Sequence, residues 1–249
     1  MRGVRRLDRD TASVPSPGAS PGVPERIWYA AYGSNMHTAR LRCYIEGGRP
    51  PGAARTYPGC RDRRPPARTV SLELPGVLYF ATESRVWTGG RAFYDPAGAP
   101  GGGSAGDPFG DRAGLRGPTG VVLARAHLLT GGQFSDIAAQ EMYESPGRDL
   151  DLRPVLRDGR DERGPGRYET LVCPGVLEGI PVVTFTAPWR HTEVAWNAPS
   201  AAYLEHLAAG LLAGRDWGVR SVAAYLSRAP GVGGAWTPGE IEALVATLG

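Results

Sequence analysis

Short apolar runs, separated by glycine- and proline-rich stretches, predict many short β-strands in the first three quarters of the chain. The run over 27–32 is bulky and aromatic, and the run over 119–126 is rich in valine and leucine. Further strands are expected at 70–74, 77–81, 91–94, 167–173 and 181–186, the last two joined by a hairpin over 174–179.

Apolar residues at helical spacing predict helices between the strands. The first is expected from about 36 to 45, with Ser34 or Asn35 as its N-cap. A second is expected over 130–142. Glu141 shares its apolar face, because it follows at i+7 the apolar series Phe134, Ile137 and Ala138.

Three more helices are expected near the end of the chain. Two cover 201–213 and 219–227, and the last begins at Thr237, where Thr-Pro-Gly-Glu forms a capping box. The first of the three carries an apolar stripe made of Tyr203, Leu204, Leu207 and Leu211.

This order of elements predicts an α+β fold, a small mixed β-barrel with flanking helices in a single domain over 25–249. Residues 1–24 are rich in arginine, serine, proline and glycine, which predicts a disordered tail. Similar composition predicts loop insertions at about 47–68, 95–118 and 145–166.

All 28 basic residues are arginine, because the chain contains no lysine. Schiff-base, P-loop and Ser–Lys chemistry are therefore excluded. The net charge is only +3 and the arginines are dispersed, so no nucleic-acid partner is expected. The exception is a basic knot at Arg61, Arg63, Arg64 and Arg68, which is either a solvated loop or a contact for an anionic part of a substrate.

The three cysteines and four histidines are far apart and lack metal-ligand spacing. We therefore expect free thiols in a reducing compartment, no metal and no cofactor. No signal peptide is expected, and no stretch approaches the ~20 apolar residues of a membrane span. The sequence is typical of a cytoplasmic protein without a membrane partner.

The segment Tyr29–Met36 places glycine, serine and asparagine at a strand-to-helix turn. Glycine permits close backbone approach, and the first N–H groups of a helix lie at its positive end. Such a turn binds a carboxylate or an oxyanion. The letters Tyr-Gly-Ser-Asn also occur in ordinary capped joints, an interpretation that this segment alone leaves open.

Glu141 is a carboxylate on the apolar face of a predicted helix. Burial raises the pKa of a carboxyl group towards the neutral range, which suits a general acid or base. The alternative is a glutamate at a helix end that reaches solvent. Glu144, three residues on and on nearly the same face, competes for the same role.

Motifs in a fixed order resemble the γ-glutamylcyclotransferase-like family. Tyr29–Met36 resembles its opening signature, Trp87–Gly90 its Trp-x-Gly-Gly strand entry, and Gly120–Val122 its central strand. Gln140-Glu141 is similar to the Gln-Glu that ends one of its helices, and Pro199–Tyr203 to the Pro-Ser-x-x-Tyr that opens its last barrel-packed helix.

The resemblance, which covers roughly residues 27–215, implies a metal-independent enzyme acting on a γ-glutamyl amide or peptide. In this family the α-amine of the substrate attacks its own γ-carbonyl, which releases 5-oxoproline and a free amine. Glu141 would be the acid/base residue, and backbone N–H groups of the turn would hold the oxyanion. The residues expected to bind this small-molecule substrate are Tyr29, Ala31, Tyr32, Gly33, Ser34, Asn35 and Tyr203.

Other functions stay open. One is removal of a γ-glutamyl protecting group, or hydrolysis of a related amide, in a biosynthetic pathway. Another is a non-catalytic small-molecule binding module on the same scaffold. A hydrolase with Ser34 as nucleophile is disfavoured, because no Gly-x-Ser-x-Gly elbow surrounds that serine. The sequence determines neither the amine partner nor the oligomeric state.

Overall fold

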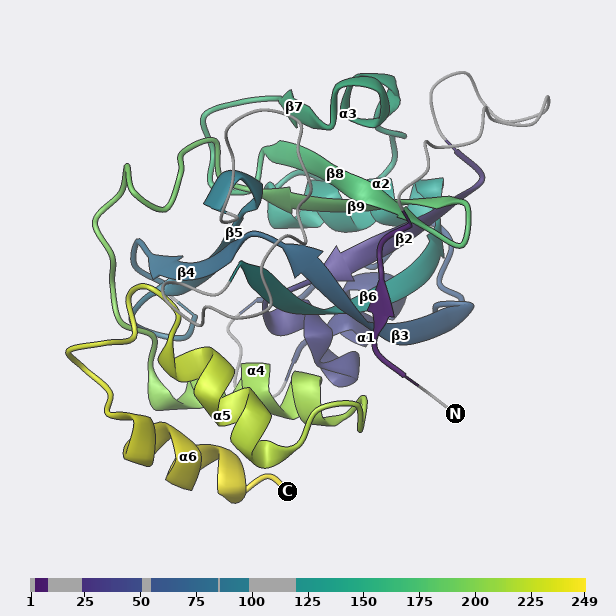
Figure 1. Cartoon of the computed structure of the whole chain (residues 1–249). Helices are drawn as coiled ribbons and strands as arrows, with labels where there is room; N and C mark the ends of the chain where they lie inside the picture. Colours follow the sequence, from purple (N-terminus) through teal and green to yellow (C-terminus); the bar gives the residue numbers. More distant parts are fainter. Residues whose placement is uncertain (1–2, 9–23, 51–54, 85, 99–119) are drawn as a thin grey trace.

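The computed structural model describes residues 3–8, 24–50, 55–84, 86–98 and 120–249 (Figure 1). Its strands are β1 (Arg5–Arg6), β2 (Arg26–Ala31), β3 (Arg68–Pro75), β4 (Val77–Ala81), β5 (Arg91–Asp95), β6 (Val121–Thr130), β7 (Arg160–Glu162), β8 (Thr170–Leu177) and β9 (Ile180–Thr186). Its α-helices are α1 (Thr38–Glu46), α2 (Gly131–Glu141), α3 (Arg153–Asp158), α4 (Ala201–Leu212), α5 (Val219–Ser227) and α6 (Pro238–Ala246), and the 3-10 turns are η1 (Ser34–Met36) and η2 (Pro96–Gly98).

A seven-stranded mixed sheet forms the centre of the fold. Its strand order is β1-β3-β6-β2-β9-β8-β7, while β4 and β5 form a separate antiparallel hairpin. β2 lies in the middle, antiparallel to β6 and parallel to β9. Residues 27–31 of β2 are all buried, which explains why their sequence is a continuous apolar run without polar alternation.

The hairpin β4–β5 is joined to the large sheet by a few contacts at its edges. Thr186, at the end of β9, donates to the carbonyl of Tyr94 at 2.7 Å and accepts from its N–H at 3.1 Å. On the other side, the N–H of Gly76 donates to the carbonyl of Gly120 at 3.2 Å. The predicted α+β class is confirmed. The sequence predicted a small mixed barrel. Among the described residues, no backbone ladder joins the hairpin to the large sheet, and these contacts connect the two instead.

α-Helices lie at two opposite ends of the molecule. In Figure 1, α4, α5 and α6 lie together on one side of the sheet, and α3 lies with β7 at the opposite end of the molecule. Ser200 caps α4 by accepting from the N–H of Tyr203. The predicted apolar stripe on α4 is confirmed, since Tyr203, Leu204, Leu207 and Leu211 are at most 3% exposed.

Two segments differ from their sequence prediction. Residues 1–24 were expected to form a tail, yet Arg5 and Arg6 pair in parallel with β3 and the N–H of Asp8 donates to the carbonyl of Val176 at 2.7 Å. The insertion at 145–166 contains α3 and β7, whose few residues are too short for a periodic pattern to mark. Most of the expected loop over 95–118 lies outside the described residues.

The first helix begins differently from the prediction. Gly33 precedes the turn η1, and α1 starts after His37, whose side chain makes no capping bond. Neither Ser34 nor Asn35 is an N-cap of α1, because both lie inside η1. No helix within the described ranges is long and apolar enough to cross a membrane.

Gly210→Ala tests how closely α4 packs against the turn η1. A methyl group built at Gly210 would lie 2.7 Å from Cβ of Met36 and 3.0 Å from the backbone nitrogen of His37. We expect the free energy of unfolding to fall by about 1–3 kcal/mol, because overpacking outweighs the gain in helix propensity. Chemical denaturation measures this difference.

Gly239→Ala is the matched control. Gly239 also lies in a helix, and a Cβ built on it meets no atom within 4 Å. This change should stabilise the protein by up to about 1 kcal/mol. If Gly210→Ala stabilised the protein as well, tight packing of α4 against η1 would be disproved.

Candidate active site

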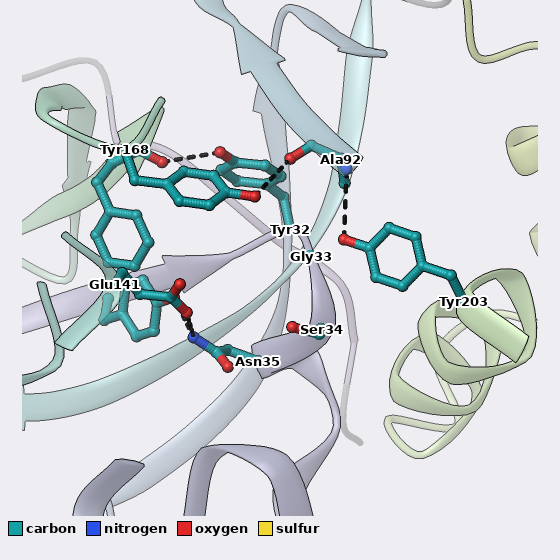
Figure 2. A pocket seen from close by; sticks show the side chains of 10 residues that line it. Tyr32, Gly33, Ser34, Asn35, Ala92, Glu141, Tyr168 and Tyr203 are labelled. Atoms are coloured by element: carbon teal, nitrogen blue, oxygen red, sulfur yellow. Dashed lines mark hydrogen bonds between the residues drawn. The ribbon is translucent and has the colours of Figure 1, made fainter. Parts of the chain in front are cut away.

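Asn35 and Glu141 meet from two different elements. Asn35 lies in η1 directly after β2, and Glu141 is the last residue of α2. The Nδ2 of Asn35 donates to Oε1 of Glu141 at 2.9 Å (Figure 2) and to the hydroxyl of Tyr29 at 3.1 Å. Asn35 is only 4% exposed and Glu141 is half-buried, so one buried amide fixes the carboxylate.

α2 is anchored at both ends, which sets the position of Glu141. Thr130 and Gln133 form a capping box at its start, a pattern that is visible in the sequence. Near its end, the fully buried Gln140 donates from Nε2 to the carbonyl of Tyr44 in α1 at 3.0 Å. The glutamine of the Gln-Glu pair therefore ties the helix end to α1 while the glutamate faces the pocket.

A pocket with a free volume of about 30 Å³ adjoins this pair. Six of the seven predicted binding residues line it together with Glu141. Ala31 is not among the lining residues and belongs to the hydrophobic core. The full lining is Tyr29, Tyr32, Gly33, Ser34, Asn35, Ala92, Glu141, Tyr168, Phe185 and Tyr203.

Three lining residues escaped the sequence analysis. Ala92 and Phe185 belong to strands whose apolar residues indicated only a hydrophobic core. Tyr168 lies between the expected insertion and β8, where an aromatic residue beside Arg167 is the one signal that marks it.

Two tyrosine hydroxyls of the pocket donate hydrogen bonds to backbone carbonyls. Tyr32 donates to the carbonyl of Phe185 at 2.8 Å, and Tyr168 donates to the carbonyl of Ala92 at 3.3 Å (Figure 2). These bonds hold the pocket walls together. Tyr32, which the sequence predicted as a substrate-binding residue of the turn, uses its hydroxyl proton in this structural bond.

The other two hydroxyls keep a proton to donate. Tyr29 accepts from Asn35, and Tyr203 accepts from the N–H of Ala92 at 3.4 Å. Within the described part of the chain, neither hydroxyl has an acceptor for its own proton. Burial, and then the charge of Glu141, raises the pKa of Tyr29, and burial raises the pKa of Tyr203 to about 12, so both stay protonated.

The turn after β2 also leaves backbone donors unused. Bonds within it run from the N–H of Met36 to the carbonyl of Gly33 and from the N–H of His37 to the carbonyl of Ser34. The N–H groups of Gly33 and Ser34 find no acceptor among the described residues. Because both residues line the pocket, two backbone donors are available there.

Two motifs far apart in sequence meet at the wall that carries Tyr203. The N–H of Gly90 donates to the carbonyl of Ala198 at 2.7 Å, and the hydroxyl of Ser200 donates to the carbonyl of Trp87 at 2.6 Å. The rings of Trp87 and Tyr203 stack with centres 5.3 Å apart. These contacts fix Tyr203 opposite the turn that carries Gly33 and Ser34 (Figure 2).

The basic knot supports α2 rather than lining the pocket. Arg61 forms an ion pair at 3.0 Å with Asp136, a buried residue of α2. Arg64 pairs with Asp62 at 2.6 Å. Arg68 pairs with Glu178 at 2.7 Å, while Arg63 donates to the carbonyl of Pro58 at 3.3 Å. Three of the four charges are therefore paired with carboxylates, and none of the four arginines is among the described residues that line the pocket.

Two histidines pack behind the turn. The rings of His37 and His206 stack with centres 4.5 Å apart, and Nε2 of His206 donates to the carbonyl of Ser34 at 3.2 Å. Burial, and then the neighbouring His37, lowers the pKa of His206 to about 4. Burial also lowers the pKa of His37.

No protein-family model matches the chain. Over 219 residues the chain is 32% identical to histone deacetylase 5 of Arabidopsis thaliana. The match covers 82% of this chain and 30% of that protein. The chain thus spans less than a third of the length of this curated relative.

Two solved structures are similar to this one. A γ-glutamyl cyclotransferase has a TM-score of 0.40 and 13% identity, covering 90% of this chain and 99% of its own. An uncharacterized protein from Homo sapiens has a TM-score of 0.42 and 16% identity, covering 89% and 99%. Both similarities lie below a TM-score of 0.5 and below 25% identity.

The lowered pKa of His206 makes a pH-dependent contribution to stability. Its folded value of about 4 lies below the ordinary 6.5, so the unfolded state binds more protons between these pH values. The contribution is fully present above pH ~6.5 and is lost as the pH falls towards ~4. His206→Gln, which can still donate to Ser34, should lose less stability than the wild type between pH 7 and pH 5.

Urea unfolding at both pH values measures this difference. Buried His127, whose pKa is lowered to about 3 by burial, contributes equally in both proteins and so cancels. Equal pH dependence of the two proteins would contradict the buried, neutral state of His206.

Proposed function

We propose that this chain is a γ-glutamylcyclotransferase-type enzyme, which cleaves a γ-glutamyl amide or peptide and releases 5-oxoproline and a free amine. One observation carries the proposal. A carboxylate held by Asn35 lies on one side of a pocket whose other walls offer four unused donors, the N–H groups of Gly33 and Ser34 and the hydroxyls of Tyr29 and Tyr203.

The reaction begins with loss of a proton from the α-ammonium group of the substrate, because an ammonium nitrogen has no lone pair. Glu141 is the one carboxylate among the described residues that line the pocket. We assign it the role of base, since its Oε2 is not engaged by Asn35. The freed amine then attacks the γ-carbonyl of the same molecule, and this intramolecular geometry supplies effective molarities of about 10⁵ M or more.

The attack forms a C–N bond and places negative charge on the former carbonyl oxygen. The backbone N–H groups of Gly33 and Ser34 are the donors we assign to this oxyanion, since neither has a protein acceptor in the described residues. The hydroxyls of Tyr29 and Tyr203 are left to bind the α-carboxylate. Both are donors, and a carboxylate only accepts.

Collapse of the intermediate breaks the original amide C–N bond. Glu141 returns its proton to the departing nitrogen. The attacking nitrogen loses a second proton as it becomes the lactam N–H, and this proton also passes through Glu141 to the departing amine, which leaves as an ammonium ion. The five-membered lactam is the second product, and no water is consumed. The carboxylate therefore ends each turnover in the state in which it began.

Hydrolysis of a γ-glutamyl or related amide is the main alternative reaction, and it would use a water where cyclisation uses the α-amine. A non-catalytic binding module is the second alternative. The name of the plant relative suggests a third amide, an acetylated lysine, although most of that relative lies outside the match. A substrate panel that includes an Nε-acetyl-lysine peptide separates these functions.

Glu141→Gln tests the acid/base assignment. We expect a folded protein whose kcat falls about 10²-fold or more, because glutamine keeps the bond pattern but takes up no proton. Liquid chromatography with mass detection of 5-oxoproline measures the rate. Glu144→Gln is the matched control, since Glu144 is exposed and lies outside the pocket lining, and it should keep the wild-type rate.

Turnover in ¹⁸O-water distinguishes cyclisation from hydrolysis. Cyclisation gives unlabelled 5-oxoproline, whereas hydrolysis gives glutamate that carries one ¹⁸O atom. Glutamate as the first product would overturn the proposed reaction while leaving Glu141 as a candidate base. Binding of substrate without any product would instead favour the binding module.

A further inference from the structure

One arginine is buried behind the pocket without a carboxylate in contact. Arg40 of α1 is 6% exposed, whereas Arg42 in the same helix is exposed and pairs with Glu46 at 3.0 Å. Among the described residues no ion pair forms to Arg40, and its Nε is buried without a hydrogen-bond partner. Taking a charged group out of water is unfavourable unless its surroundings compensate the charge. The groups around Arg40 therefore decide what it does.

Aromatic rings form a cage around Arg40. Its Cζ lies 5.5 Å from the ring centre of Tyr44, 5.1 Å from that of Tyr57 and 5.9 Å from that of Trp87. Its Nη2 donates to the hydroxyl of Tyr57 at 2.7 Å. Ring faces attract a cation, but they carry no net charge. The cage therefore holds the guanidinium in place and leaves its positive charge without a counterion in contact.

The cage is joined to the pocket on two sides. The ring of Trp87 stacks on the lining residue Tyr203, with centres 5.3 Å apart. The carbonyl of Tyr44 accepts at 3.0 Å from the glutamine that directly precedes Glu141. Arg40 is thus separated from Tyr203 by one ring and is tied through Tyr44 to the end of α2.

The charge of Glu141 acts on this buried cation. Burial lowers the pKa of Arg40, but Tyr44, Tyr57 and Glu141 together raise it above its ordinary value, so the group stays charged. Glu141 is the one carboxylate among these three groups. The other groups on which Glu141 acts are tyrosines with raised pKa values, namely Tyr29, Tyr44, Tyr168 and Tyr203. Arg40 is therefore the one cation in this set.

Resting on the proposed function, we propose that Arg40 is a positioning residue whose buried positive charge keeps Glu141 ionised as the base and then compensates the oxyanion. Before proton transfer the negative charge is on Glu141, and after the attack it is on the former carbonyl oxygen. Both places belong to the same pocket. A cation fixed behind that pocket stabilises the charge in both and needs no reorganisation between them.

Arg40→Met removes the charge and leaves a side chain of similar length. We expect the acidic limb of the pH profile of kcat/KM to move to higher pH by about one unit, the low end of the effect of a neighbouring opposite charge. Glu141 then needs a higher pH to ionise, because no cation favours its charged form. On the plateau, kcat should fall about tenfold, less than the loss from removing a donor in contact with an oxyanion. Formation of 5-oxoproline measures both.

Two histidines near the cage have to be separated from this effect. Burial, and then His37 and Arg40, lower the pKa of His206 to about 4, and burial lowers the pKa of His37. Both are therefore neutral near pH 7. The double variant Arg40→Met/His206→Gln, compared with His206→Gln alone, should show the same movement of the acidic limb. Loss of the movement in this pair would assign it to His206 and overturn the role of Arg40.

Two further variants separate charge from structure. Arg40→Lys keeps the charge and should keep the wild-type limb, and the exposed change Arg42→Met in the same helix should keep both rate and limb. Urea unfolding should find Arg40→Met at least as stable as the wild type, because an apolar side chain replaces a buried charge without an ion pair. An unfolded Arg40→Met, or one that is slower by the same factor at every pH, would show a structural role and overturn the proposal.

NMR titration of the ¹³C-labelled side chain of Glu141, assigned with Glu141→Gln, separates this proposal from the proposed reaction. If the wild type makes no 5-oxoproline but the titration midpoint is higher in Arg40→Met, the reaction is wrong and the coupling of Arg40 to Glu141 stands. If product forms with the same acidic limb in both proteins, the reaction stands and the role of Arg40 is wrong. Absence of both product and movement overturns both.

Discussion

The hydrogen bond from Asn35 to Glu141 is the contact on which the pocket depends. Asn35 is 4% exposed, so its amide cannot turn to water if it loses a partner. Rotation of Glu141 into solvent would leave that amide with the hydroxyl of Tyr29 alone, and an unsatisfied buried donor costs about 1–3 kcal/mol. A carboxylate at a helix end would otherwise favour solvent. Here the free-energy cost of leaving an N–H of Asn35 without an acceptor keeps the Glu141 carboxylate in the pocket.

The rest of the structure holds the two ends of that bond in register. Asn35 follows β2, which is buried on both faces at the centre of the sheet and so is a rigid support. Glu141 ends a helix that is fixed at its start by a capping box, along its length by the ion pair of Arg61 with Asp136, and near its end by Gln140. Each support lies outside the pocket, which explains why polar residues remote from it are buried.

The sequence predicted the elements with strong periodicity and missed those set by tertiary contacts. The run in β2, the stripe on α4 and the capping box at Thr237 each carry a local signal, and each is present. β1 has two residues and α3 has six, so neither spans enough positions to show a period. The register of η1 was missed because its bonds replace the side-chain cap that Ser34 and Asn35 suggested.

The candidate site likewise contains residues that the sequence marks and residues that only the fold reveals. Polar motif residues such as Ser34 and Glu141 stand out against an apolar strand and helix, and they meet at one pocket. Phe185 and Ala92 line it equally, yet no feature distinguishes them from core residues until the backbone is placed. The sequence also contained no sign of which hydroxyl, that of Tyr29 or that of Tyr32, keeps a proton free to donate. This depends on which hydroxyl finds a backbone acceptor, and that acceptor lies on a distant strand.

The distribution of donors and acceptors limits which ligand groups fit the pocket. Glu141 is the one carboxylate among the described lining residues, whereas the hydroxyls of Tyr29 and Tyr203 have no acceptor for their own protons there. A group that only accepts hydrogen bonds therefore fits beside the two tyrosines, and a group that carries a proton fits beside Glu141. Glu141 and Tyr203 lie on different walls because α2 supplies the carboxylate and η1 its amide, while α4 supplies Tyr203.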